Sequence, residues 1–305
     1  MATVLRVPWQ GLVRLLLVVC VMPWAEGWKV LVVPMEGSHW LSMRDVVREL
    51  HSRGHQAVVL APEVSLHIRG DDFFTLNSFS FPYTQEEYDN FFKECTLILQ
   101  AQNILEIWFK TLRSMQKFFE LYLTSCVQML HNSTLISQLK ASSFDVVLTD
   151  PVFPCGAVLA LYLNIPAVFF LRGLAGGLDF EGTQCPQPLS YVPQWLTTYS
   201  DHMTFLQRVN NMVYPLGFNL LCHFGFSSYA SMASELLQRE VSVVDVLSHA
   251  SVWLMRWDFV LEYPRPIMPN MVFIGGINCM SRKPSSQAVR GQPVFTYELE
   301  HLVVA

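Results

Sequence analysis

Two ionisable residues, His39 and Asp150, each follow a short apolar run of the sequence. His39 stands in Val-Pro-Met-Glu-Gly-Ser-His-Trp, just after the run 30–33, and Asp150 ends the run that begins at Phe144. The carboxyl ends of parallel strands meet at one edge of a sheet, where open α/β folds place their chemistry. An imidazole oriented there by a carboxylate on Nδ1 can take a proton from a bound hydroxyl through Nε2. We therefore predict that His39 and Asp150 are catalytic.

Each residue taken alone also has a structural interpretation. A histidine is often a hydrogen-bonded structural group, and an aspartate before Pro151 often forms a turn. Two such positions, each at the end of an apolar run, favour the catalytic interpretation.

Other chemistries lack their motifs in this sequence. There is no G-x-S-x-G turn for a Ser-His-Asp hydrolase, and Ser38 beside His39 is wrongly placed for a proton relay. There is no H-E-x-x-H, so we predict no metal site. No G-x-G-x-x-G follows the first apolar run, so a nicotinamide cofactor is not expected. The glycine-rich segment 172–177 carries no phosphate-binding lysine and is interpreted as a turn.

Strand and helix patterns alternate along the chain. A strand over 29–34 is followed by a helix, which we predict to start at a capping box Ser42–Asp45 and to run to about Arg53. Gly54 ends that helix, and a second strand follows over 56–61. Further strands are predicted over 73–81, 144–149, 165–171, 249–255 and 271–274. Helices are predicted over 84–140, 156–162 and 201–239, and a loop over 172–200. This alternation predicts an α/β fold, a parallel sheet with flanking helices.

The helical region 84–140 carries a broad apolar stripe. Its members recur at three- and four-residue steps: Leu105, Phe109, Leu112, Met115 and Phe119. The stripe either packs on the sheet, or lines an apolar substrate site, or lets residues 84–125 touch a membrane.

Composition excludes some partners. Of the 305 residues, 51% are hydrophobic and only 15% are charged, which indicates a large core and some exposed apolar surface. The net charge of −5, with no long Lys/Arg run, argues against a nucleic-acid partner.

The amino-terminal residues predict entry into the secretory pathway. Residues 1–27 have the pattern of a signal peptide: Arg6 and Arg14 flank the apolar stretch 15–22, which is too short to span a bilayer, and Ala25-Glu-Gly27 fits cleavage. Asn132-Ser133-Thr134 is then a glycosylation acceptor. The later cysteines match no metal or compact disulfide pattern, so we expect mostly buried thiols, with one or two disulfides as the alternative: 95, 126, 155, 185, 222 and 279.

Four runs of residues carry a resemblance to a known family. They are Gly-Ser-His-Trp-Leu-Ser-Met (37–43), Ser-Phe-Asp-Val-Val-Leu-Thr-Asp-Pro (143–151), Asp-His-Met-Thr-Phe-Leu-Gln-Arg (201–208) and Tyr-Pro-Arg-Pro-Ile-Met-Pro-Asn-Met-Val-Phe-Ile-Gly-Gly-Ile-Asn-Cys (263–279). In this order they resemble the vertebrate family 1 UDP-glucuronosyltransferases, up to about Gln287.

The resemblance implies the amino-terminal half of a GT-B glycosyltransferase. Residues 28–287 would form a Rossmann-like domain that binds small lipophilic acceptors such as phenols, steroids, bile pigments and drugs. His39 would deprotonate the acceptor hydroxyl, with Asp150 as its charge partner. UDP-glucuronic acid would be the co-substrate, with no resident cofactor, and the product a β-glucuronide. Location on the lumenal side of the endoplasmic reticulum is also implied.

The sequence departs from the family pattern after Gln287. The family continues into a donor-binding domain and a transmembrane helix, whereas residues 288–305 are a divergent tail that we expect to be disordered or loosely packed. By family, the function is glucuronosyl transfer. The alternative is an inactive truncated isoform that binds acceptors or modulates full-length sibling transferases, and a third hypothesis is a gene-model fragment.

Overall fold

A parallel sheet forms the centre of the molecule. The computed structural model describes residues 27–97, 104–174, 177–194, 197–260 and 262–277. The strands are β1 (Lys29–Val33), β2 (Gln56–Pro62), β3 (Thr75–Phe79), β4 (Val146–Thr149), β5 (Ala167–Leu171), β6 (Ala250–Met255) and β7 (Met271–Phe273). Their order in space is β3-β2-β1-β4-β5-β6-β7, with every neighbouring pair parallel. This confirms the predicted fold class.

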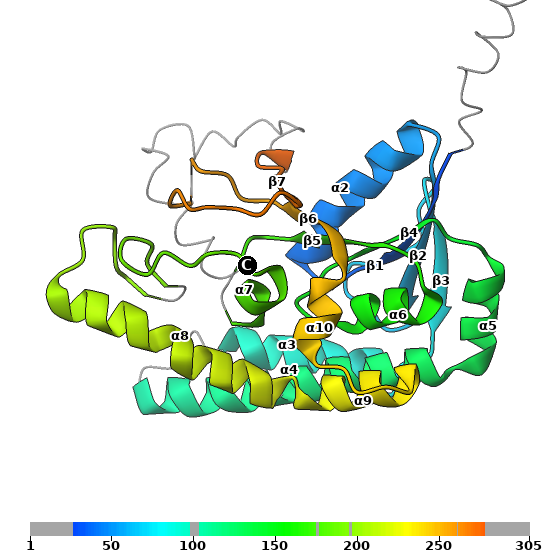
Figure 1. Cartoon of the computed structure of the whole chain (residues 1–305). Helices are drawn as coiled ribbons and strands as arrows, with labels where there is room; N and C mark the ends of the chain where they lie inside the picture. Colours follow the sequence, from blue (N-terminus) through cyan, green and yellow to red (C-terminus); the bar gives the residue numbers. More distant parts are fainter. Residues whose placement is uncertain (1–26, 98–103, 175–176, 195–196, 261, 278–305) are drawn as a thin grey trace, which may run out of the picture.

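Helices cover both faces of the sheet (Figure 1). They are α2 (Ser38–Ser52), α3 (Gln85–Leu97), α4 (Ile104–His131), α5 (Ser133–Ala141), α6 (Cys155–Leu163), α7 (Leu178–Thr183), α8 (Phe205–Gly225), α9 (Ser227–Leu237) and α10 (Val243–Ser248). Helix α2 packs on one face, and α4, α5, α6, α9 and α10 share the core on the other.

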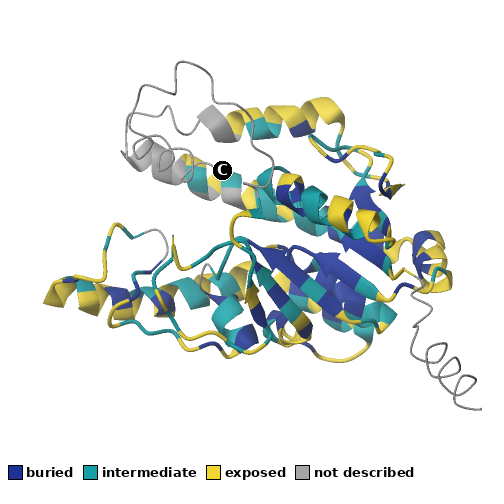
Figure 2. Cartoon of the chain, turned by 90° about the horizontal axis from the view of Figure 1, so that it is seen from above, coloured by how far each residue is buried: buried dark blue, intermediate teal, exposed yellow. Residues whose placement is uncertain are grey.

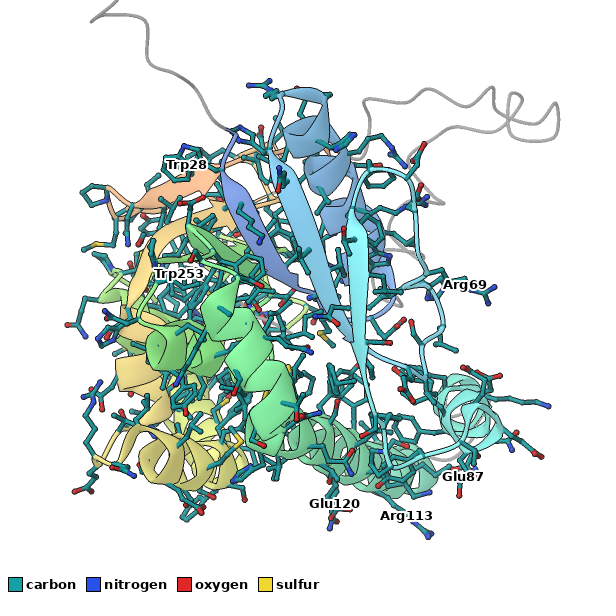
Figure 3. All side chains as sticks on the ribbon, turned by 90° about the vertical axis from the view of Figure 1, so that its right-hand side faces the viewer. Trp28, Arg69, Glu87, Arg113, Glu120 and Trp253 are labelled. Carbon is teal, nitrogen blue, oxygen red and sulfur yellow. A yellow bond between two sulfur atoms is a disulfide. The ribbon has the colours of Figure 1, made fainter. Side chains whose placement is uncertain are left out.

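The strands are apolar because both faces of the sheet are buried. Leu31 points into the core shared with α4 and α6, and its neighbour Val32 into the core beneath α2. Figure 2 shows the buried residues, in dark blue, concentrated in the strands, with exposed residues on the outer sides of the helices. Figure 3 shows Trp253 among packed side chains, whereas Glu87, Arg113 and Glu120 project from the outside of α3 and α4.

The predicted start of the first helix is wrong. Helix α2 begins at Ser38, four residues before the expected capping box at Ser42–Asp45. The Ser42 hydroxyl instead donates to the carbonyl of Ser38 inside the helix, and Asp45 pairs with Arg48. The turn before α2 is made by Gly37 at φ 71°, a left-handed conformation that suits glycine. His39 therefore lies in the first helical turn, not in a loop.

Other element boundaries also differ from the prediction. The region 84–140 divides into α3, α4 and α5, and the predicted loop 172–200 contains the short helix α7. The region 201–239 forms α8 and α9, and α8 starts at Phe205 after a capping box of Thr204 and Gln207. Helix α10 was not predicted, although Ser242 and Asp245 cap it in the same way.

Cys126 and Cys155 form a disulfide that joins α4 to the start of α6. Cys185 is a buried free thiol and Cys222 a half-buried one, so the expectation of buried thiols holds for only part of the set. The signal peptide predicted at 1–27 falls almost wholly outside the described residues, as does the tail 288–305. None of the helices in the described ranges is long and apolar enough to cross a membrane.

Candidate functional site

The order of strands reverses between β1 and β4. Chain order runs outward from β1 to β3 on one side, and from β4 to β7 on the other. Such a switch point leaves a crevice at the carboxyl edge, where open α/β sheets bind ligands. The two strands end level with each other, because Val33 pairs with Thr149 and the Thr149 hydroxyl donates to the Val33 carbonyl at 2.8 Å. The residues that follow β1 and β4 are thereby brought together.

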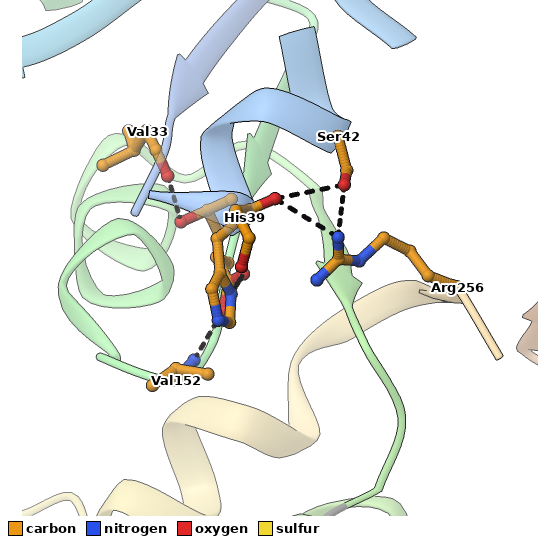
Figure 4. A network of polar contacts seen from close by, with 8 residues as sticks. Val33, His39, Ser42, Val152 and Arg256 are labelled. Carbon is orange, nitrogen blue, oxygen red and sulfur yellow. Dashed lines mark hydrogen bonds and ion pairs between the residues drawn. The ribbon is translucent and has the colours of Figure 1, made fainter. Parts of the chain in front are cut away.

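His39 and Asp150 meet at this crevice, and Figure 4 shows His39 within its network of polar contacts. His39 Nδ1 lies 2.5 Å from Asp150 Oδ2. The Asp150 side chain is only 1% exposed and that of His39 17%. The backbone N–H of Val152 donates to Asp150 Oδ1 at 3.0 Å, so both carboxylate oxygens have a partner. The predicted neighbours are therefore in hydrogen-bond contact.

The contact with Asp150 determines the tautomer of the neutral His39 ring. An ionised carboxylate only accepts hydrogen bonds, so a neutral His39 ring beside it carries its proton on Nδ1. The lone pair of Nε2 is then free to take a proton from a hydroxyl, and Asp150 stabilises the imidazolium that forms. The chemistry that the pair supports is general-base catalysis.

Arg256, at the end of β6, holds the helical turn that carries His39. Its guanidinium donates to the Ser38 carbonyl and to the Ser42 hydroxyl, as Figure 4 shows. Burial lowers the pKa of Arg256, and the nearby Asp150 carboxylate opposes that shift. The sequence analysis did not single out Arg256, because nothing in the local pattern connects it with a residue more than 200 positions away.

An apolar cavity lies beside the pair. Its enclosed space is small, about 70 Å³, and the empty space between its lining residues reaches about 650 Å³ only when the adjoining open solvent is included. Apolar residues of β1, β2, β3 and α4 form most of its wall, and Asp150 reaches it. His39 is not part of the wall and borders the cavity through Asp150. The residues that line it include Val33, Met35, Glu36, Leu60, Ile68, Phe79, Phe81, Tyr88, Leu121, Tyr122, Met129 and Phe153.

The apolar stripe of α4 contributes to this region only in part. Phe119 packs against Phe153 and Phe226, while the side chains of Leu105, Phe109, Leu112 and Met115 lie outside the described set. The cavity wall comes from the next turns of α4, residues 121–129. Contact of residues 84–125 with a membrane stays a prediction.

The sequence analysis did not single out Glu36 and Tyr122, two polar residues of the cavity wall. Glu36 is buried, and its carboxylate accepts from the Ser65 hydroxyl and from the backbone N–H of His67 at 3.3 Å. The hydroxyl oxygen of Tyr122 is buried without a hydrogen-bond partner among the described residues. Burial raises the pKa of the Tyr122 phenol well above its ordinary value.

Asn132 does not line the cavity. It is exposed and caps α5, its side-chain oxygen accepting from the N–H of Leu135 at 3.0 Å. A glycan attaches to the side-chain nitrogen, so the cap does not conflict with glycosylation, which stays a prediction. Within the described ranges, no group of three or more His, Cys, Asp and Glu side chains could hold a metal ion.

Sequence comparison places the chain in a family. Residues 28–292 match the family described as "UDP-glucoronosyl and UDP-glucosyl transferase". The chain belongs to this family. It is 65% identical over 288 residues to UDP-glucuronosyltransferase 1-2 of Rattus norvegicus and 62% identical to the Mus musculus protein of that name. Identity to UDP-glucuronosyltransferase 1A3 of Homo sapiens is 60% over 289 residues.

The extent of these matches matters for the function. Each alignment covers 94% of this chain but 54% of the relative, so the chain spans about half the length of the curated relatives it matches. Among solved structures, spinosyn forosaminyltransferase SpnP is 14% identical, with 81% of this chain and 50% of that chain covered and a TM-score of 0.43. The fold assignment rests on the sheet order rather than on this likeness.

Proposed function

We propose that residues 28–287 form the acceptor-binding domain, and supply the general base, of a UDP-glucuronosyltransferase. The reaction is transfer of glucuronic acid from UDP-glucuronic acid to a hydroxyl of a small lipophilic acceptor such as a phenol, steroid, bile pigment or drug. The observation that carries the proposal is the 2.5 Å contact between His39 and Asp150 at the switch point, beside an apolar cavity. The sequence relatives with that activity in their names support it.

The acceptor binds mainly through its apolar body. Burial of apolar surface contributes roughly 25 cal/mol per Å², and the wall of the cavity is largely aliphatic and aromatic. A molecule seated there lies beside Asp150 and presents a hydroxyl to His39 at the rim. The disulfide between Cys126 and Cys155, which also lines the cavity, ties α4 to the segment that follows Asp150.

The transfer step then follows from the tautomer of His39. Nε2 takes the proton of the acceptor hydroxyl as its oxygen attacks the anomeric carbon of the sugar. The bond from that carbon to the diphosphate oxygen breaks, and UDP leaves with the electron pair. Attack from the side opposite UDP inverts the anomeric centre and gives a β-glucuronide. Asp150 stabilises the imidazolium until the proton is released.

UDP-glucuronic acid is held by residues beyond this domain in our proposal. The relatives are about twice as long as the aligned region, and the resemblance assigns donor binding to their carboxyl-terminal half. We place the reaction on the lumenal side of the endoplasmic reticulum, where the predicted leader 1–27 and the glycosylation triplet at Asn132 would direct and mark the chain.

The test is a transfer assay on a fused protein. Residues 28–287 of this chain are followed by the carboxyl-terminal half of the rat relative, and the fused protein is given UDP-glucuronic acid and a phenol. We expect conjugate formation, and His39→Gln should lower kcat about 10²- to 10⁴-fold, the usual contribution of a general base. The control is His67→Gln, a histidine that pairs with the other carboxylate of the cavity wall. Equal activity of parent and His39→Gln would disprove the proposal.

A second candidate function is association with full-length sibling transferases. Helix α8 exposes an unusual number of large apolar side chains, including Phe205, Leu206, Met212, Val213, Leu216, Leu220, Leu221 and Phe224. Apolar patches of this kind mark interaction surfaces. A Leu216→Glu, Leu220→Glu variant should then lose co-purification with a sibling, while Val260→Glu, at an exposed apolar position in a loop, should retain it. Co-purification that survives the α8 changes would remove this candidate.

A further inference from the structure

Glu36 is a buried carboxylate for which the transfer mechanism has no use. It follows β1 and lines the cavity that Asp150 also reaches. Its Oε2 receives the backbone N–H groups of Gly37 and His67, both at 3.3 Å, and lies 3.4 Å from His67 Nδ1. Its Oε1 receives the Ser65 hydroxyl. A carboxylate oxygen can accept about two hydrogen bonds, so Oε1 retains room for one more donor.

Glu36 has no permanent counter-ion. Among the described residues its ionic partner is His67, which is 44% exposed, and neither lysine nor arginine pairs with it there. Histidine changes its charge near neutral pH, unlike lysine or arginine. A buried carboxylate held by neutral donors gains stability from any further donor that enters the cavity.

Tyr122 provides an independent sign of a missing partner. Its ring is stacked on Phe153, with centroids 4.4 Å apart and planes 4° from parallel, which fixes the direction of its hydroxyl. That oxygen is buried, lines the same cavity and makes no hydrogen bond to the described residues. Glu36 and Asp150 face it, and the Tyr88 phenol is close enough to affect its pKa as a hydrogen-bonding neighbour, although the two hydroxyls do not meet hydrogen-bond geometry. Buried hydroxyls are normally paired, so a ligand can supply a better-aligned partner than the Tyr88 hydroxyl does.

We propose that Glu36 and Tyr122 form an anchor for a second hydroxyl group of the acceptor. The second hydroxyl donates its hydrogen to Glu36 Oε1 and accepts one from the Tyr122 hydroxyl. The first hydroxyl faces His39, so the preferred acceptors are apolar bodies with a hydroxyl at each end. This rests on the proposed function, whose acceptor class it narrows.

The anchor also predicts which molecules bind poorly. A methyl ether in place of the second hydroxyl can accept from Tyr122 but offers nothing to Glu36. A carboxylate at that end is repelled by Glu36. A hydrogen bond to a charged group corresponds to about a tenfold to hundredfold difference in affinity.

The experiment measures ligand binding to the full 305-residue chain without donor. One- and two-ring diphenols with a hydroxyl at each end are compared, by calorimetry, with the same compounds carrying one methoxy or one carboxylate group. The parent should bind a diphenol at least tenfold more tightly than its methyl ether. Glu36→Gln, which keeps an oxygen for Ser65, should reduce that ratio to below about threefold and leave binding of the methyl ether within threefold.

Two further variants keep the outcome decisive. Tyr122→Phe removes a donor that the diphenol and its methyl ether both use, so it should weaken both ligands and leave their ratio near the parental value. Glu63→Gln, an exposed glutamate just after β2, is the matched control and should retain the parental ratio. A parent with no preference for diphenols, a preference that survives in Glu36→Gln, or unchanged affinity of both ligands in Tyr122→Phe would overturn the proposal. Because no transfer is measured, failure of glucuronosyl transfer in the fused protein would leave this result standing, and the reverse also holds.

Discussion

Two histidine–carboxylate pairs lie at the same edge of the sheet, and they are built differently. In the pair of His39 and Asp150, the two side chains are 2.5 Å apart, and the histidine is 17% exposed. In the pair of His67 and Glu36, the separation is 3.4 Å and the histidine is 44% exposed. Both carboxylates are buried. The difference between the pairs therefore resides in the histidines.

Position in the fold explains this difference. His39 lies in the first turn of α2, which Arg256 holds from β6 through Ser38 and Ser42. His67 lies in the irregular segment after β2, where its backbone N–H, rather than its ring, makes the hydrogen bond to Glu36. A fixed imidazole with one free nitrogen suits proton transfer, whereas a carboxylate satisfied by neutral donors suits recognition. Both pairs consist of a histidine and a carboxylate, so residue type alone does not show which pair suits proton transfer and which suits ligand recognition.

Replacing each carboxylate by the corresponding amide should give the largest difference in rate between the two pairs. In the fused protein, Asp150→Asn should lower kcat for a phenol with one hydroxyl about 10²- to 10⁴-fold, because the amide can donate to Nδ1 and leave the proton on Nε2. Glu36→Gln should change that rate less than threefold, since such a phenol has no second hydroxyl. Initial rates at saturating UDP-glucuronic acid measure both. Equal losses in the two variants would show that the pairs do not differ in role.

Loss of the disulfide should have the next largest effect. Cys126 and Cys155 are 29 residues apart, and a loop of that size corresponds to about 3–4 kcal/mol of stabilisation in the chain-entropy account. Cys126→Ala with Cys155→Ala should lower the free energy of unfolding by roughly that amount in urea titrations. This cross-link braces the segment beside Asp150, and none among the described residues braces the segment of His67.

The matched control for the disulfide is a free thiol. Cys222→Ala removes a half-buried cysteine with no covalent partner and should cost less than about 1.5 kcal/mol. A double alanine variant as stable as the parent would mean that the disulfide does not support this side of the cavity.

His67→Gln should have the smallest effect. Exposed ion pairs contribute about 0–1 kcal/mol, and the hydrogen bond from the His67 backbone to Glu36 survives the substitution. We expect a change in unfolding free energy below about 1 kcal/mol by the same titration. A loss of about 3 kcal/mol or more would give the His67 ring a structural importance that its exposure does not suggest.

The sequence predicts that His39 and Asp150 meet because each follows an apolar run. The strands that precede His39 and Asp150 follow from hydrophobic patterning, and a parallel sheet brings the segments after them to one edge. Glu36 stands in the same turn as His39, but its partners, Ser65 and His67, come from beyond the next strand with no local signal.

Other features depend on tertiary contacts that no local pattern encodes. The sequence pattern cannot select Cys126 and Cys155 from the available pairings. The start of α2 was misplaced because Ser42 and Asp45 match a capping box, while the actual helix start depends on the left-handed turn at Gly37. The long helical region was predicted as one unit because a propensity pattern does not reveal where packing divides it into α3, α4 and α5.

A double-mutant cycle tests the central claim most directly. The kcat of the fused protein is measured for the parent, His39→Gln, Asp150→Asn and the variant carrying both changes, with one phenol and saturating donor. If Asp150 acts only through His39, its substitution should cost less than about threefold more once His39 is already glutamine, because residues that act as a unit are not additive. Losses that multiply, so that the double variant falls by the product of the two single effects, would contradict a shared role for this pair.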